Sequence, residues 1–238
     1  MKNINIIPTF PDRYEIRESF RKIRSNIIFS GKDLKVISVT SATQHEGKSV
    51  VSMELAKSMS STERKVLFID ADIRKSVIAD KYITETGLLG LSHYLSGQVS
   101  SDDIIYETQF PNLYMILSGP YPPNPVELLG SNRFSELIEK CREEFDYVII
   151  DTPPLCHVID AAVVSNCADG VIMNIAAKRI STKMANDVKY QLERGGCKII
   201  GAILNFAESS GSTYNYYNKY SSYISEREQK NFASLETK

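Results

Sequence analysis

Runs of apolar, often β-branched residues alternate along this chain with segments in which apolar residues recur at helical spacing. Near-continuous apolar strands that alternate with helices are typical of a parallel sheet covered by helices on both faces. The pattern therefore predicts an α/β fold. We expect strands at 35–41, 65–70, 113–119, 147–154, 170–176 and 198–206, and helices at 49–60, about 132–144, 159–167 and 181–193.

One more helix is expected before the first of these strands, over residues of about 12–30. Its apolar residues form a single narrow stripe at intervals of three and four: Ile16, Phe20, Ile23 and Ile27. Glu18, Arg21 and Arg24 lie off this stripe, on the polar side. They fit a solvated face with an intrahelical Glu–Arg pair worth about 0.2–0.5 kcal/mol, or a contact with another subunit. Spacing alone leaves both hypotheses open.

The composition changes after Phe206. The segment 207–238 is rich in Ser, Asn, Tyr and charged residues and poor in aliphatic ones, so it can bury little surface. We therefore expect one domain over 1–206 and a flexible tyrosine-rich tail over 207–238. Five of the 13 tyrosines lie within ten residues of this tail: Tyr214, Tyr216, Tyr217, Tyr220 and Tyr223. A cluster of this kind could be merely an aggregation-prone or docking segment.

Composition narrows the class of protein. With 238 residues and 42% hydrophobic content, the chain can bury one sizeable core, as a single α/β domain does. The 28 basic and 29 acidic residues give a formal charge of −1 without a long basic stripe, which argues against a nucleic-acid partner. No apolar run approaches the roughly 18–20 residues of a membrane span, and the first residues lack the apolar centre of a signal peptide. We therefore expect a cytoplasmic protein.

The loop after the first predicted strand carries a phosphate-binding pattern. In G-x-x-x-x-G-K-[ST], Ala42 replaces the first glycine, and Gly47, Lys48 and Ser49 match the end. Loop N–H groups and a helix N-terminus would surround a phosphate, Lys48 would place a positive charge at the β- and γ-phosphates, and Ser49 would offer an oxygen to Mg²⁺. The pattern predicts a P-loop NTPase-like fold that binds nucleotide through Ala42, Thr43, Gln44, His45, Glu46, Gly47, Lys48, Ser49 and Val50.

Carboxylates end two other predicted strands. Asp70 and Asp72, followed by Arg74, end the segment "VLFIDADIR", and Asp151 ends "VIID". Ligands of open parallel sheets bind beyond the carboxyl ends of the strands, where these acids would meet the P-loop. A single carboxylate there could be a helix cap. Three of them beside a phosphate loop indicate Mg²⁺, which needs hard oxygen ligands or water held by carboxylates.

Taken in order, the motifs resemble those of the bacterial tyrosine kinases of the P-loop type, in particular the stand-alone cytoplasmic kinases of Gram-positive capsule and exopolysaccharide loci. The segments that carry the resemblance are "ESFRKIRSNI", "SATQHEGKS", "LFIDADIRK", "SGPYPPNPVELLGS", "VIIDTPPLCHVIDA", "GAILN" and the tyrosine-rich tail. It identifies 42–49 as the Walker A motif, 70–74 as Walker A′ and Asp151 as the end of Walker B.

The resemblance implies an ATP-dependent protein-tyrosine autokinase that regulates capsular or exopolysaccharide biosynthesis. Lys48 would bind nucleotide phosphate, and four residues would organise Mg²⁺ directly or through water: Ser49, Asp70, Asp72 and Asp151. One Walker A′ carboxylate would help to deprotonate the tyrosine, and Asp70 is our choice over Asp72. A base is useful because an unperturbed tyrosine pKa near 10 leaves little phenolate at pH 7. Asn205 matches a position that contacts adenine in related ATPases, with structural capping as the alternative.

The resemblance also implies partners. Glu18, Arg21 and Arg24 match the element E-x-x-R-x-x-R, which mediates assembly of a homo-oligomeric ring, and the tail tyrosines match the autophosphorylation cluster of the family. Such kinases are activated by a membrane-anchored protein, a polysaccharide co-polymerase, which would recruit this chain to the inner face of the membrane. A protein-tyrosine phosphatase would be a further partner.

The chain departs from the family at four positions. The family commonly has Pro-Gly at Gln44 and His45, Thr at Val50 and Pro at Ser76; among these, His45 is the critical one if its site requires a positive φ. Two other functions compete with the kinase. One is an ATPase switch like the partitioning and septum-positioning proteins, and the other is a nucleotide-gated binding module with negligible catalysis.

Overall fold

The computed structural model describes residues 2–10, 13–31, 33–155 and 160–207. Contacts divide the chain after Asn205 into one unit of residues 1–205 and a second of 206–238. Only residues 206 and 207 of the second unit are described, so the predicted tail tyrosines lie outside the described residues. No helix in the described part of the chain has the length and apolar character that a membrane crossing requires.

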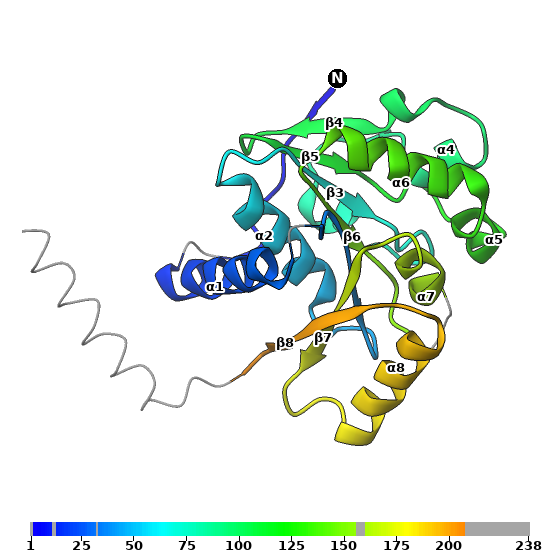
Figure 1. The fold of residues 1–238 in the computed structure, drawn as a ribbon. Helices are drawn as coiled ribbons and strands as arrows, with labels where there is room; N and C mark the ends of the chain where they lie inside the picture. The colour runs from blue at the N-terminus through cyan, green and yellow to red at the C-terminus, as the bar shows by residue number, and fades with distance from the viewer. Residues whose placement is uncertain (1, 11–12, 32, 156–159, 208–238) are drawn as a thin grey trace, which may run out of the picture. The chain divides into compact units, whose positions relative to one another are not determined.

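A single eight-stranded sheet forms the centre of the first unit, in the order β1-β4-β5-β3-β6-β2-β7-β8 (Figure 1). All neighbouring strands run parallel except β4 and β5, which are antiparallel. The strands are β1 (Lys2–Ile4), β2 (Val36–Ser41), β3 (Val66–Asp70), β4 (Ile105–Thr108), β5 (Leu113–Ile116), β6 (Tyr147–Asp151), β7 (Gly170–Ala176) and β8 (Ile199–Asn205). The predicted P-loop NTPase-like α/β fold is confirmed.

Helices cover both faces of this sheet (Figure 1). They are α1 (Tyr14–Ser30), α2 (Lys48–Ser60), α3 (Ile78–Tyr82), α4 (Leu91–Leu95), α5 (Pro125–Leu129), α6 (Asn132–Glu144), α7 (Asp160–Ser165) and α8 (Thr182–Arg194), with a 3₁₀ turn, η1, at Ser101–Asp103. Alternate residues of β3 show the two layers: Phe68 packs in the cluster that contains α1 and α2, whereas Leu67 and Ile69 pack in the cluster of α4, α5 and α6. Both faces of the strand are therefore core, which explains its uninterrupted apolar sequence.

Two strands and several short helices are absent from the sequence prediction. β1 has three residues and pairs with β4, which has four and runs antiparallel to β5. Segments this short contain too few residues for a period of two to be distinguished from chance. Their assignment depends on the strands beside which they lie.

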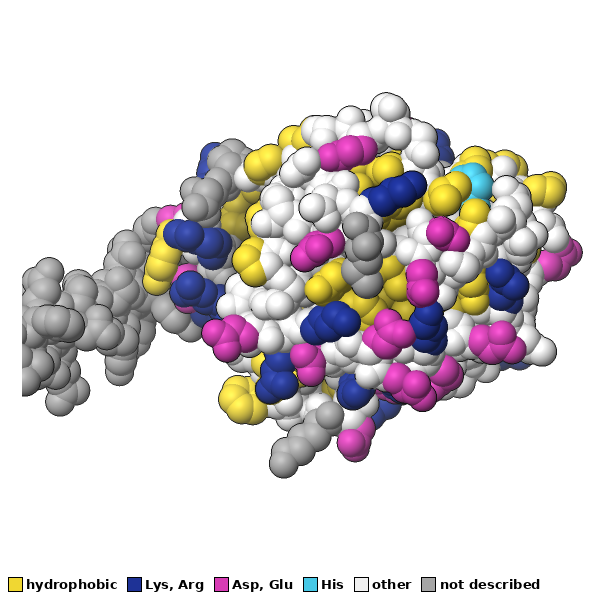
Figure 2. Space-filling model, turned by 90° about the horizontal axis from the view of Figure 1, so that it is seen from above, with side chains coloured by type: hydrophobic (Ala, Val, Ile, Leu, Met, Phe, Trp, Pro, Cys, Tyr) yellow, Lys and Arg dark blue, Asp and Glu magenta, His cyan; other side chains and the backbone are white. Residues whose placement is uncertain are grey.

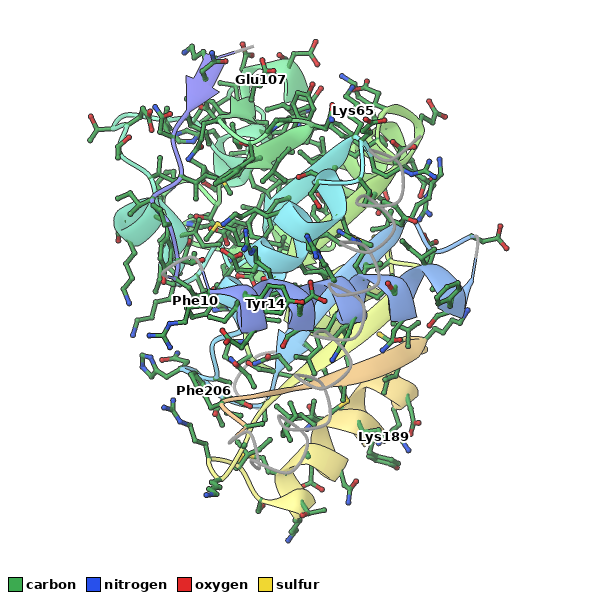
Figure 3. All side chains as sticks on the ribbon, turned by 90° about the vertical axis from the view of Figure 1, so that its left-hand side faces the viewer. Phe10, Tyr14, Lys65, Glu107, Lys189 and Phe206 are labelled. Carbon is green, nitrogen blue, oxygen red and sulfur yellow. The ribbon has the colours of Figure 1, made fainter. Side chains whose placement is uncertain are left out.

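The predicted N-terminal helix begins at Tyr14 and ends at Ser30. Phe20 and Ile27 of its apolar stripe are buried, and Ile16 and Ile23 are partly buried against the same cluster. In Figure 3 this helix crosses the face that is turned to the viewer, with Phe10 and Tyr14 at its N-terminal end. On the face seen in Figure 2, basic and acidic side chains are interspersed rather than segregated.

Candidate functional site

The loop between β2 and α2 has two residues with left-handed backbone. Gly47, with φ of 79°, precedes the first residue of α2, and His45 has φ of 65°. A glycine adopts this conformation without a steric penalty, whereas a residue with a Cβ atom loses about 1 kcal/mol. His45 therefore occupies a strained position, and the loop keeps its shape at that cost.

A buried carboxylate holds the loop in place. Glu46 is only 1% exposed, and its Oε1 accepts from the Thr43 N–H (2.5 Å) and the Thr43 hydroxyl (3.1 Å). Its Oε2 accepts from the N–H of Ala176 at the end of β7 (3.0 Å). The Glu46 backbone carbonyl accepts from the side-chain amides of Asn174 (2.8 Å) and Asn205 (2.9 Å). The P-loop is thus tied to two strand ends, a role that the sequence pattern, which leaves this position free, could not reveal.

Asn205 is placed by these contacts beside the loop, at the end of β8. Its amide donates to the loop backbone, as the capping hypothesis requires. Neither Asn205 nor Ala42 lines the pocket described below, and Ala42 is buried in a cluster with α8. The contact of Asn205 with adenine stays a prediction.

Lys48 and Asp151 form an ion pair beneath the loop. Lys48 Nζ lies 2.8 Å from Asp151 Oδ1, and both side chains are less than a tenth exposed. The Ser52 hydroxyl, one turn along α2, donates to the same oxygen (2.9 Å). Asp151 Oδ2 is buried without a hydrogen-bond partner among the described residues. An unpartnered buried carboxylate oxygen is costly, and a bound cation or its water would satisfy it.

Asp70 lies opposite Asp151, because their strands are neighbours and the two residues are paired in register. Asp70 is fully buried; its Oδ1 accepts from the Asp72 N–H (3.2 Å) and its Oδ2 from the Ser76 hydroxyl. Burial, reinforced by the negative charge of Asp151, raises the pKa of Asp70 to about 8, although the Ser76 hydrogen bond opposes the shift. Burial thus favours the neutral form of Asp70 more strongly than it would be favoured at an exposed position.

Asp72 is nearer to the solvent than Asp70. It is 9% exposed and accepts from the Lys75 N–H (3.1 Å). Burial raises its pKa, and the positive charge of Lys48 opposes that increase. Two carboxylates with raised pKa values next to a third carboxylate are typical of a site that binds a cation.

A pocket of about 290 Å³ opens above these groups. The loop residues 43–50 and Asp72 line it, whereas Asp70 and Asp151 do not and lie beneath. Arg74 also lines it and is held by the fully buried Asp160 of α7, since its Nε lies 3.1 and 3.0 Å from the two carboxylate oxygens. The structure thus brings the Walker residues together around one pocket. Three further side chains that act on this site were missed in the sequence analysis: Ser52, Asp160 and Asn174. Ser76 was noted there only as a departure from the family, and its contact with Asp70 was not foreseen.

The oxygen donors suit Mg²⁺ that arrives with nucleotide. Among the residues that the structure describes, no three side chains of His, Cys, Asp or Glu are grouped so that they could hold a metal ion on their own. Mg²⁺ characteristically keeps water and takes one or two carboxylates together with substrate phosphates. Ser49 in the pocket and the free oxygen of Asp151 beneath it fit that kind of site.

The predicted assembly residues lie apart from this pocket, on α1. Arg21 pairs with Glu18 one turn away, as the intrahelical hypothesis expects. Arg24 donates to the backbone carbonyl of Ser58 on α2. None of the three residues lines the phosphate pocket.

Comparison with known proteins places these features in a family. Residues 34–193 match the model of a family described as an AAA domain. The chain is 42% identical over 203 residues to the tyrosine-protein kinase CpsD of Streptococcus agalactiae, which covers 85% of this chain and 89% of that protein.

Two solved structures are also similar. The kinase domain of the Escherichia coli tyrosine kinase ETK is 32% identical, with a TM-score of 0.75 over 82% of this chain and 78% of that one. The chimerical protein CapA2B2 is 32% identical, with a TM-score of 0.77 over 81% of this chain and 85% of that one.

Proposed function

Because this chain belongs to the bacterial tyrosine-protein kinases, we propose that it is an ATP- and Mg²⁺-dependent autokinase that phosphorylates its own tail and regulates capsular or exopolysaccharide biosynthesis. The observation that carries the proposal is Lys48, which lines the pocket of the P-loop and pairs with the buried Asp151, next to which Asp70 lies in register. Mg²⁺, held by Ser49, Asp72 and Asp151, would neutralise charge on the transferred phosphoryl group.

Lys48 has two roles in this proposal. In the structure its ammonium group compensates the buried Asp151 at 2.8 Å. A nucleotide phosphate in the pocket would offer Lys48 a second partner, and a cation at the unpartnered Asp151 Oδ2 would then compensate this carboxylate in place of the lysine. The lysine thereby couples nucleotide binding to the state of the Walker B carboxylate.

The tyrosine must lose a proton while its oxygen attacks phosphorus. Our prediction that Asp70 accepts this proton requires the carboxylate to be ionised and within reach, yet Asp70 is fully buried with a pKa of about 8. Asp72 lines the pocket, so a substrate hydroxyl bound there would lie nearer to Asp72 than to the fully buried Asp70. The choice of Asp70 over Asp72 as the base therefore stays a prediction, with Asp72 as the alternative because it lines the pocket.

The finer parts of the function rest on the family resemblance. The proposed acceptors are Tyr214, Tyr216, Tyr217, Tyr220 and Tyr223, in a tail that begins at 207 and follows a kinase domain over 1–206. Assembly into a ring through Glu18, Arg21 and Arg24, recruitment from the cytoplasm by a membrane-anchored activator, and reversal by a protein-tyrosine phosphatase complete the proposal.

The test is incubation of the purified chain with ATP and Mg²⁺, with and without a candidate activator peptide, followed by intact mass and phosphosite mapping. We expect phosphate confined to residues 214–223 and absent in Lys48→Met. Lys22→Met is the matched control, because it removes an exposed lysine on α1 that lies outside the pocket. Full tail phosphorylation in Lys48→Met would refute the site. ATP hydrolysis with an unchanged protein mass, even with activator, would favour the ATPase switch.

A further inference from the structure

A second hollow among the described residues is larger than the phosphate pocket. A groove of about 620 Å³ lies between α1, the C-terminal half of α2, the segment that precedes α1 and Phe110. The apolar residues that line it include three aromatic side chains: Phe10, Phe20 and Phe110. Phe20 is nearly buried, whereas Phe10 is 37% exposed at the N-terminal end of α1 (Figure 3).

Positive charge surrounds this aromatic part. Five cationic side chains line the groove: Arg13, Arg17, Arg21, Arg24 and Lys57. Glu54 is the one carboxylate among the described lining residues. This excess of positive charge contrasts with the chain as a whole, in which acidic and basic residues balance. The groove therefore favours an anionic ligand.

Two of the cations are held in defined positions. Arg24 Nη1 donates to the Ser58 carbonyl and the Ser61 hydroxyl (3.1 Å) at the end of α2, which orients the guanidinium group in the groove wall. Lys57 Nζ is fixed by Glu54 at 2.7 Å and lies 4.6 Å from the centroid of the Phe110 ring. A guanidinium group has five N–H donors in a planar fork, so a fixed arginine is suited to bidentate contact with a phosphate. Lys57 and Phe110 form a wall against which a second aromatic ring can pack.

We propose that this groove binds phosphotyrosine, presented by the phosphorylated tail of a second copy of this chain. A phosphotyrosine carries an aromatic ring and about −1.5 to −2 charges on one side chain, and the groove offers both an aromatic wall and clustered arginines. The proposal rests on the proposed function, since a tyrosine kinase is the source of such a ligand. The tail holds five tyrosines in ten residues, which makes it the most concentrated source in the sequence.

Occupancy of the groove has a consequence for assembly. Arg21 and Arg24 line the groove and are also two of the three residues proposed to hold the ring together. One guanidinium group cannot pair fully with a phosphate and with a neighbouring subunit at the same time. Binding of a phosphopeptide and contact with a neighbouring subunit would thus compete for these arginines.

Binding of synthetic peptides tests the proposal. Fluorescence anisotropy would measure the affinity of the chain for six labelled peptides that span residues 212–225. One peptide is unphosphorylated, and each of the other five is phosphorylated at one tyrosine. We expect at least one phosphopeptide to bind at least about tenfold more tightly than the unphosphorylated peptide. Arg13→Ala and Arg21→Ala should each weaken that binding several-fold, whereas Lys22→Ala, which removes a positive charge from the same helix outside the groove, should leave it unchanged. Both arginines are exposed, so these changes leave the core intact.

Three outcomes would overturn the proposal. They are equal affinity for phosphorylated and unphosphorylated peptides, equal affinity for peptides with Glu in place of phosphotyrosine, and complete displacement by inorganic phosphate at the same concentration as the peptide. Because the phosphate is introduced by synthesis, binding does not depend on kinase activity. An active kinase that binds no phosphopeptide refutes the groove alone, and an inactive chain that binds one refutes the proposed function alone.

Discussion

Asp70→Asn should have a free energy of unfolding that exceeds that of the wild type by an amount that grows as the pH rises. Asp70 is fully buried, and burial raises the pKa of its carboxyl group to about 8 in the folded chain, from an ordinary value of 3.8. Between these two values the folded state binds a proton that the unfolded state has released. The free energy of unfolding therefore falls as pH increases through this window, and the contribution of the neutral carboxyl is fully present only below about pH 4.

The slope that Asp70 contributes is at most about 1.4 kcal/mol per pH unit, so the wild type should lose up to about 4 kcal/mol between pH 5 and pH 8 through this residue. Asn keeps the shape of the neutral carboxyl, with one acceptor and one donor, and it does not titrate. The Ser76 hydroxyl and the Asp72 N–H can still find a partner on it. The variant should therefore lack this part of the pH dependence.

Urea unfolding at pH 5, 6, 7 and 8, with EDTA and without nucleotide, measures the effect. The difference in free energy of unfolding, variant minus wild type, should rise with pH by several kcal/mol. Asp187→Asn, which changes an exposed carboxylate on α8, should give a difference that does not vary with pH. If the curves of Asp70→Asn and the wild type run parallel, Asp70 is ionised in the folded chain and the reasoning about its burial fails.

Other positions of the site give further predictions. Lys48→Met should destabilise the nucleotide-free chain by about 3 kcal/mol, because it leaves Asp151 buried without its cation; an unchanged urea midpoint would contradict the ion pair. His45→Gly should stabilise the chain by about 1 kcal/mol and raise Tm by a few degrees, since φ of 65° costs glycine nothing; a lower Tm in calorimetry would show that the imidazole makes a compensating contact. Glu46→Gln should cost about 1–3 kcal/mol and weaken ATP binding in calorimetric titration, because an amide cannot accept from both Thr43 and Ala176; unaltered affinity would show that the loop does not need this brace. Ser76→Ala removes a hydrogen bond that lowers the pKa of Asp70, so the loss of stability should continue to higher pH than in the wild type, and an unchanged unfolding profile would exclude the contact.

Much of this architecture follows from local sequence. The six central strands are recognisable because each is buried on both faces and is therefore apolar throughout, as Leu67, Phe68 and Ile69 show. The stripe of α1 is readable because a helix that packs on one side repeats every three to four residues. The phosphate loop is identified by Gly47, Lys48 and Ser49. Glycine permits the loop backbone, lysine supplies the positive charge, and serine supplies the oxygen for Mg²⁺. The sequence also points to Asp70 and Asp151 as groups at strand ends.

The tertiary structure decides what these groups can do. The order of the strands makes β3 and β6 neighbours and thereby places Asp70 opposite Asp151. No local sequence pattern encodes this order. The pKa of Asp70 depends on how completely other segments exclude water from it, and the fixed position of Glu46 depends on Ala176 and Asn205, which are more than a hundred residues away in the chain. The groove beside α1 likewise exists only because α2 and Phe110 complete its walls. The chemistry of each residue is local, whereas burial, pairing and shape arise from contacts between distant segments. The sequence therefore determined which groups are present, and the fold determined their charge and which other groups they contact.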